Sequence, residues 1–268
     1  MFRLYLCIFF VCYLGELPGA FARENVLYYP RPEADFDERT GYPLALLRLA
    51  FQQSEELKSY SLKPTDIRMP RGRSLKLLEK GIAIDIFWSI STPQRDEGLT
   101  KVDFDLYKGM FGYRLLMVNK ANKAGFELMN SPAEIKEKVA ALGYDWPDYE
   151  IFIRNGFNVQ GTSSYSGLFT LLERNRVDYL PRSLFEIWSE SDFFKNQDFQ
   201  VVESFAIYYP ITFNYYLNRE DKDIAALLED SLNLLYQKGD FDLLFSVVWQ
   251  DSMERANLDD KRIVHLDN

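Results

Sequence analysis

Residues 81–95 read GIAIDIFWSISTPQR, and this stretch decides the fold class of the chain. Its apolar part, from Ile82 to Phe87, lacks strict alternation, which is typical of a strand covered on both faces in a mostly parallel sheet. Ligands of open α/β sheets bind beyond the carboxyl ends of the strands. We therefore expect a binding site lined by Trp88, Ser89, Ser91, Thr92 and Arg95. An exposed turn with a solvated arginine is the alternative.

A second segment of the same build follows about eighty residues later. Residues 176–187 read RVDYLPRSLFEI, which predicts a short apolar strand that ends at Arg182 and Ser183. Two strand ends, each with an arginine and a hydroxyl, predict two half-sites that face each other. An ion pair between Arg182 and Glu186, four residues further on, is the alternative for this arginine.

The two segments carry a family resemblance. TPQR at 92–95 and NRVDYL at 175–180 resemble motifs of the periplasmic solute-binding proteins of family 3, the amino-acid-binding components of ABC transporters. The resemblance implies an α/β chain with the type 2 periplasmic-binding-protein fold, in which two three-layer αβα lobes are joined by two hinge crossings. It implies a first lobe of residues 23–116 and 212–268 and a second lobe of residues 117–211, which close around a ligand.

The resemblance also implies site residues. Arg95 would hold a ligand carboxylate, because a planar guanidinium matches a carboxylate bidentately. Asp145 and Trp146 precede Pro147, a residue suited to the first turn of a helix whose N-terminus would face the ligand. Trp146 could equally be a packing residue. Tyr29 follows the first predicted strand and would form part of the cleft wall.

The chain departs from the family pattern after the second strand. The family usually has an aspartate there that meets the ligand's amino group, whereas this chain has Arg182 and Ser183. A cationic amine beside Arg182 would be repelled unless Glu186 turned toward the site. The sequence therefore predicts a small polar ligand that is anionic, with a polyhydroxylated ligand as the alternative.

The N-terminus predicts export. Residues 1–22 combine Arg3, an apolar stretch from Leu4 to Leu14 and a small-x-small ending at Ala22, as signal peptides do. Both cysteines of the chain lie inside this segment, so the mature protein is expected to have none. No later segment reaches the roughly 20 apolar residues of a membrane span. We expect a periplasmic, monomeric protein without stable membrane insertion.

The composition argues against several function classes. The net charge is −9, whereas nucleic acids and anionic lipids are bound by basic patches. The chain has one histidine, His265, so no histidine-based triad or metal cluster can be built. The sequence predicts no catalytic residue, no metal and no cofactor.

The sequence leaves three functions open. The first is a solute-binding protein that clamps its ligand for an ABC importer, which would make a permease its partner. The second is a ligand-responsive partner of a membrane sensor. The third is a periplasmic dehydratase resembling cyclohexadienyl dehydratase, with Glu186 or Asp145 as an acid of raised pKa. We expect a binding protein and not an enzyme.

Overall fold

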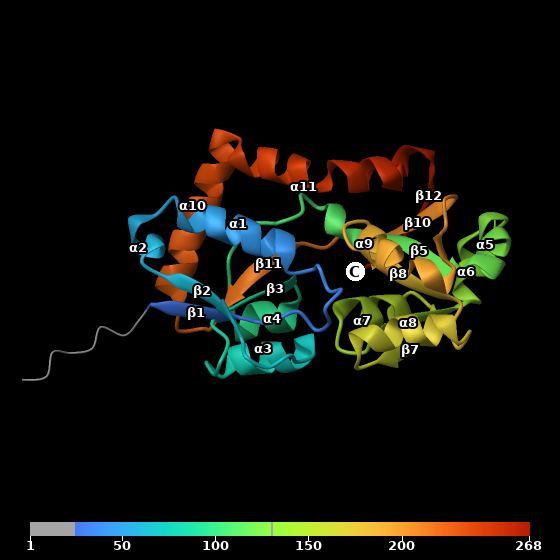
Figure 1. Ribbon diagram of the computed structural model, residues 1–268, viewed down its shortest axis with the longest axis horizontal. Helices are drawn as coiled ribbons and strands as arrows, with labels where there is room; N and C mark the ends of the chain where they lie inside the picture. The colour runs from blue at the N-terminus through green and yellow to red at the C-terminus, as the bar shows by residue number, and fades with distance from the viewer. Residues whose placement is uncertain (1–24, 130) are drawn as a thin grey trace, which may run out of the picture.

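The computed structural model describes residues 25–129 and 131–268, which form two lobes that lie side by side (Figure 1). The predicted signal peptide, with Cys7 and Cys12, lies outside the described residues. Strands and helices alternate along the chain, which gives the mixed α/β architecture expected from the sequence.

The first lobe is built on two small sheets. One pairs β1 with β2 in parallel, and the other has the order β3-β11-β4 with antiparallel neighbours. Its strands are β1 (Val26–Tyr29), β2 (Ser61–Pro64), β3 (Ile86–Ile90), β4 (Thr100–Lys101) and β11 (Phe213–Leu217). Its helices are α1 (Gly41–Phe51), α2 (Glu55–Lys58), α3 (Arg71–Glu79), α4 (Pro93–Gly98), α10 (Lys222–Lys238) and α11 (Asp240–Ala256).

The second lobe is built on one larger mixed sheet. Its order is β12-β10-β5-β8-β6-β7, and β9 also pairs with β5. The strands are β5 (Tyr113–Asn119), β6 (Val139–Gly143), β7 (Asn158–Thr162), β8 (Tyr179–Ser183), β9 (Phe199–Val201), β10 (Phe205–Tyr208) and β12 (Arg262–His265). The helices are α5 (Lys120–Glu127), α6 (Pro132–Lys136), α7 (Pro147–Arg154), α8 (Tyr165–Glu173) and α9 (Ile187–Phe193). Short 3₁₀ turns occupy Met110–Gly112, Lys195–Gln197 and Leu258–Asp260.

The chain passes between the lobes three times. The two expected crossings join β4 to β5 and β10 to β11. A third follows α11, which lies along both lobes in Figure 1 and leads into β12. Because β12 pairs in parallel with β10, residues 262–265 belong to the second sheet and not to the first lobe as predicted. Residues 113–116 also pair in that sheet, since β5 is one continuous strand.

The strand of the opening segment begins later than its apolar residues suggested. Gly81 and Ala83 have positive φ angles of 63° and 61°, so the chain turns there, and Ile82 is 53% exposed. The ladder with β11 pairs Ile86 with Leu217 and Ile90 with Phe213 and is antiparallel, so the mostly parallel sheet expected for this strand is wrong. Sheet pairing, and not apolarity alone, therefore sets the start of β3, and Trp88 and Ser89 lie inside the strand.

Local capping rules account for several helix starts. The Ser164 hydroxyl accepts a hydrogen bond from the Gly167 N–H at 3.2 Å and caps α8, as its sequence predicts. Pro147 stands at the first position of α7, so Trp146 is the N-cap residue of that helix. Both helix N-termini are on the second lobe. In the described part of the chain, no helix is both long and apolar enough to cross a bilayer.

Candidate functional site

A cavity between the two lobes is the candidate site. It leaves about 60 Å³ for the centres of water-sized spheres, so it is a small cavity between the lobes. Both lobes contribute to its wall, and aromatic rings form much of it: Tyr42, Phe87, Tyr107, Phe111, Trp146, Phe185, Phe213 and Trp249. Five arginines also line it: Arg39, Arg71, Arg95, Arg114 and Arg182.

Arg95 reaches the cavity from α4. Its Nη1 donates to the Ser89 hydroxyl at 2.9 Å and to the Ile90 carbonyl at 2.8 Å, which fixes the guanidinium against the end of β3. Thr92 caps α4 by accepting a hydrogen bond from the Arg95 N–H at 3.3 Å. Burial lowers the pKa of Arg95, because desolvation disfavours its charged form. Arg95 has no carboxylate partner within salt-bridge distance among the described residues.

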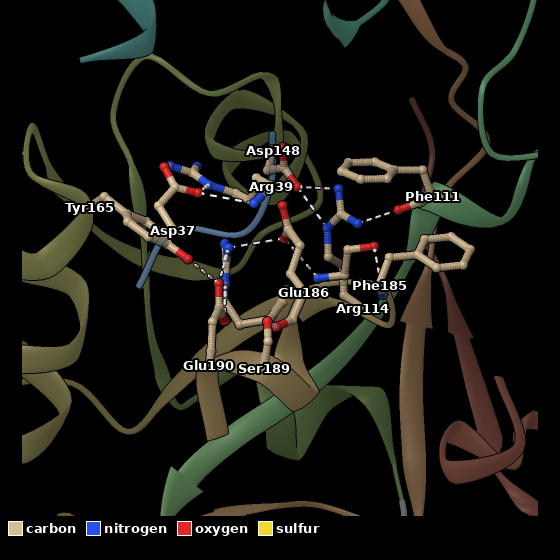
Figure 2. A network of polar contacts seen from close by, with 12 residues as sticks. Asp37, Arg39, Phe111, Arg114, Asp148, Tyr165, Phe185, Glu186, Ser189 and Glu190 are labelled. Carbon is tan, nitrogen blue, oxygen red and sulfur yellow. Dashed lines mark hydrogen bonds and ion pairs between the residues drawn. The ribbon is translucent and has the colours of Figure 1, made fainter. Parts of the chain in front are cut away.

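Arg114 and Asp148 form a buried ion pair at the back of the cavity. Figure 2 shows the Arg114 guanidinium between the Asp148 carboxylate and the Phe111 carbonyl. Its Nε and Nη2 lie 2.8 and 2.7 Å from the same Asp148 oxygen, and the Tyr209 hydroxyl donates to that oxygen too. Burial acts to raise the pKa of Asp148, but Arg114 and Tyr209 together lower it. This carboxylate is therefore ionised and fully partnered.

Arg182 is neutralised by two glutamates of its own lobe. Its Nη2 lies 2.6 Å from Glu190 and 2.9 Å from Glu186, and its Nε donates to Glu190 at 2.8 Å. The Tyr165 hydroxyl donates to Glu190 at 2.5 Å (Figure 2). Burial acts to lower the pKa of Arg182, but the two carboxylates raise it. The predicted ion pair with Glu186 exists, and Glu190 is the closer partner.

Residues 30–40 of the first lobe hold the second lobe against it. The Phe36 ring lies among Tyr165, Phe169, Phe193 and Phe194, with centroids 4.8 to 5.5 Å away. These four rings belong to α8 and α9 or follow α9 directly. The lobes are therefore joined by aromatic packing as well as by the crossings.

A charged group of the same segment supports this contact. Arg39 lies over the Tyr165 ring, 3.7 Å from its centroid, and Asp37 accepts hydrogen bonds from it at 2.7 and 2.8 Å. Burial acts to raise the pKa of Asp37, but Arg39 and the Glu33 N–H lower it to about 2. Ion pairs within residues 30–40 thus fix this loop, and the stacking of Arg39 on Tyr165 joins it to the second lobe.

A further contact closes the cavity at its edge. Asp145, before α7, accepts a hydrogen bond at 2.7 Å from the Gly72 N–H of α3, in the other lobe. A Cβ atom at Gly72 would lie 2.3 Å from that carboxylate oxygen, so only glycine allows this approach. The lobes touch at residues from five separate segments, which encloses the cavity.

Many solved structures have the same two-lobed fold, although no sequence comparison finds a related protein. No protein-family profile matches the chain, and neither does any curated protein. A Salmonella typhimurium periplasmic binding protein with high arginine specificity superposes with a TM-score of 0.64 at 12% identity, over 84% of this chain and 99% of that one. The glutamate-bound ligand-binding core of GluR0 from Nostoc punctiforme gives 0.60 at 11%, over 84% and 97%.

A third structure is a histidine kinase sensor domain described as similar to periplasmic binding proteins, with a TM-score of 0.61 at 14% identity, over 84% of this chain and 96% of that one. These chains are matched over nearly their whole length. The chain has the two-lobed fold of periplasmic binding proteins. The resemblance that the sequence suggested is thereby confirmed at the level of the fold.

Within this periplasmic-binding-protein fold, the predicted site residues divide into two groups. Arg95, Ser89, Asp145, Trp146 and Arg182 line the cavity. The other four, Trp88, Tyr29, Ser91 and Ser183, are not among its lining residues, and neither is Thr92, whose hydroxyl caps α4.

Each of these four has a structural position that explains the difference. The Trp88 ring is in the core, packed against Tyr29 and Tyr215 with centroids 5.9 and 6.3 Å away. The Ser91 hydroxyl donates to Asp96 at 2.7 Å, outside the cavity wall. Ser183 is fully buried inside β8, and its N–H donates to Glu186 at 3.3 Å. Strand residues alternate between faces, so apolar and hydroxyl side chains of one strand cannot all face one cavity.

Several charged residues of the cavity wall stand out in no sequence pattern or were not predicted, among them Arg71, Glu38 and Arg114. Arg71 begins α3 and Glu38 precedes α1, and neither stands in a motif. Arg114 was detectable, because it is the one charged residue in the apolar run YRLLMV, and a charge in a buried strand requires a partner. Its partner Asp148 lies 34 residues away, so no local pattern identifies the pair. No cluster of metal-ligating side chains occurs within the described ranges.

Proposed function

We propose that this chain is an exported solute-binding protein whose lobes close over a small ligand that carries a carboxylate. The observation behind the proposal is the charge state of the cavity wall. Three of its arginines are matched by carboxylates of the protein, whereas Arg95 and Arg71 have no carboxylate within 4.0 Å among the described residues. A desolvated guanidinium without a counter-ion is unfavourable, and a ligand carboxylate would supply one.

An amino acid fits this cavity as well. The expectation that Arg182 would repel an amine assumed an unpaired guanidinium, and Glu186 and Glu190 neutralise it. Glu186 and Glu38 both line the cavity and could accept hydrogen bonds from a ligand amine. Structures of the same fold are described as bound to arginine and to L-glutamate, which supports a ligand of this class.

A thermal-shift panel of amino acids, dicarboxylates and sugar acids tests the proposal. A ligand at about 100 times its Kd adds about 2.7 kcal/mol. A domain of this size gains roughly 2–4 °C per kcal/mol, so a ligand should raise the Tm by roughly 5–11 °C.

Arg95→Gln should abolish that shift, whereas Arg73→Gln, an exposed arginine of α3, should keep it. If no carboxylate raises the Tm of the wild-type protein, the proposed function is wrong. If the ligand raises the Tm of Arg95→Gln as much as that of the wild type, Arg95 does not hold the ligand carboxylate.

The partner has two candidates. An ABC importer is the expected one, with the protein in the periplasm, and similarity to a histidine kinase sensor domain supports a role in sensing as the second. Genes for a permease and an ATPase beside this one would favour transport, and a kinase or cyclase gene would favour sensing.

A further inference from the structure

Two arginines meet the same edge of β3. Arg71 donates to the Trp88 carbonyl, and Arg95 donates to the Ile90 carbonyl at 2.8 Å. The Ser91 N–H donates to the Thr212 carbonyl at 2.9 Å. In this antiparallel pairing, the odd-numbered residues of β3 therefore direct their N–H and C=O groups toward β11. The carbonyls of Trp88 and Ile90 therefore point away from β11, to the free edge. Two residues of a strand span roughly 6.6 Å, which is the spacing of these two carbonyl groups along the edge.

Both guanidinium groups keep N–H donors for a ligand. Arg71 lies over the Phe87 ring, 4.6 Å from its centroid, which orients the guanidinium plane while its edges remain available. Arg95 donates to Ser89 and Ile90 through Nη1 alone. Burial lowers the pKa of Arg71 to about 10, and the charges of Arg39 and, less strongly, Arg95 act in the same direction, whereas Glu33 and Asp37 act to raise it. Both remain protonated at neutral pH.

The remaining arginines of the cavity are excluded from this role. Arg39 is paired with Asp37 and Glu33, Arg114 with Asp148, and Arg182 with Glu186 and Glu190. Within the described residues, Arg71 and Arg95 are thus the cavity arginines without a carboxylate at salt-bridge distance, and both donate to the free edge of β3.

We propose that the cavity binds a short dicarboxylate, with one carboxylate on Arg95 and the other on Arg71. This inference rests on the proposed function and narrows its ligand class. Two arginines of one cavity wall, each without a carboxylate at salt-bridge distance, match a ligand with two acid groups. An amino group on the same ligand would face Glu186 or Glu38, which makes acidic amino acids and plain dicarboxylates the two sources.

Isothermal titration calorimetry with two matched pairs tests the inference. The probes are L-glutamate against L-glutamine and glutarate against glutaramate, since each pair differs by one carboxylate. We expect each dicarboxylate that binds to do so at least tenfold more tightly than its amide. If the acid binds more tightly than its amide in both pairs, two carboxylates are sufficient for recognition. If it does so only for L-glutamate against L-glutamine, recognition also requires the amine.

Variants assign the second carboxylate. Arg71→Gln should weaken the dicarboxylate about tenfold or more and leave the amide within about twofold, whereas Arg73→Gln, from the same helix, should change neither. Equal binding of acid and amide, or an unchanged preference in Arg71→Gln, would overturn the inference while the carboxylate-binding function stands. If none of the four probes binds, but another carboxylate of the panel does, the dicarboxylate assignment is again wrong. If no carboxylate binds at all, both proposals are wrong.

Discussion

The buried Arg114–Asp148 pair gives the sharpest stability prediction. Arg114 is 2% exposed and Asp148 is 4% exposed, and Asp148 accepts hydrogen bonds from Arg114 and Tyr209. Replacing Asp148 by asparagine keeps the shape and leaves the guanidinium without a counter-ion. Breaking a buried pair on one side costs about 3–5 kcal/mol. At roughly 2–4 °C per kcal/mol, the Tm should fall by roughly 6–20 °C.

The assay is thermal unfolding followed by circular dichroism at neutral pH, with a control from the same helix. Glu150 is exposed in the first turn of α7, so Glu150→Gln should change the stability by less than about 0.5 kcal/mol. The double variant Arg114→Met with Asp148→Leu should recover much of the loss, because an apolar pair leaves no buried charge. Equal Tm values for Asp148→Asn and Glu150→Gln would refute the reasoning.

Acid titration adds a second readout. The pKa of Asp148 is lower in the folded protein than its usual value of 3.8, so its ionised form stabilises the fold above that value. This contribution should disappear as the pH falls from about 4 through the lower folded pKa. The difference in stability between wild type and Asp148→Asn should therefore shrink in strong acid. A difference that stays constant there would contradict an ionised Asp148.

Two further predictions concern the contacts between the lobes. Phe36→Ala should lower the free energy of unfolding by about 2–3 kcal/mol, which is less than the loss of a fully buried ring costs. It should also increase the radius of gyration measured by small-angle X-ray scattering. The control Leu128→Ala, at a side chain that is 76% exposed, should change neither quantity. Gly72→Ala should also open the lobes, because its Cβ would lie 2.3 Å from the Asp145 carboxylate. Adding Asp145→Ala should restore the compact state. If the double variant stays open, the Asp145 carboxylate is not the group that clashes.

Local patterns carried the expectations that the structure bears out. The apolar runs predicted an α/β chain, and Arg95, expected beyond the end of a strand, lines the cavity. Pro147 fixed the start of α7, and with it the place of Trp146 on the cavity wall. Such signals are readable because capping and helix initiation depend on residues within one turn of each other.

Packing decided the features that the patterns misplaced. The ladder with β11 placed Trp88 in the core, although its position beside serines suggested a cleft residue. The same ladder turned the Trp88 carbonyl to the free edge, where Arg71 meets it. A one-residue change of register exchanges the faces of a strand, and the sequence of one strand alone does not set that register.

The sequence by itself determined the lobed α/β fold and the presence of arginines near the strand ends. Only the tertiary structure decided which of those arginines are free to bind a ligand. Arg182 and Glu190 are eight residues apart and Arg114 and Asp148 thirty-four, and each pair meets because helices pack onto a sheet. Charge compensation depends on distances of a few ångströms between segments remote in sequence, and folding alone sets those distances.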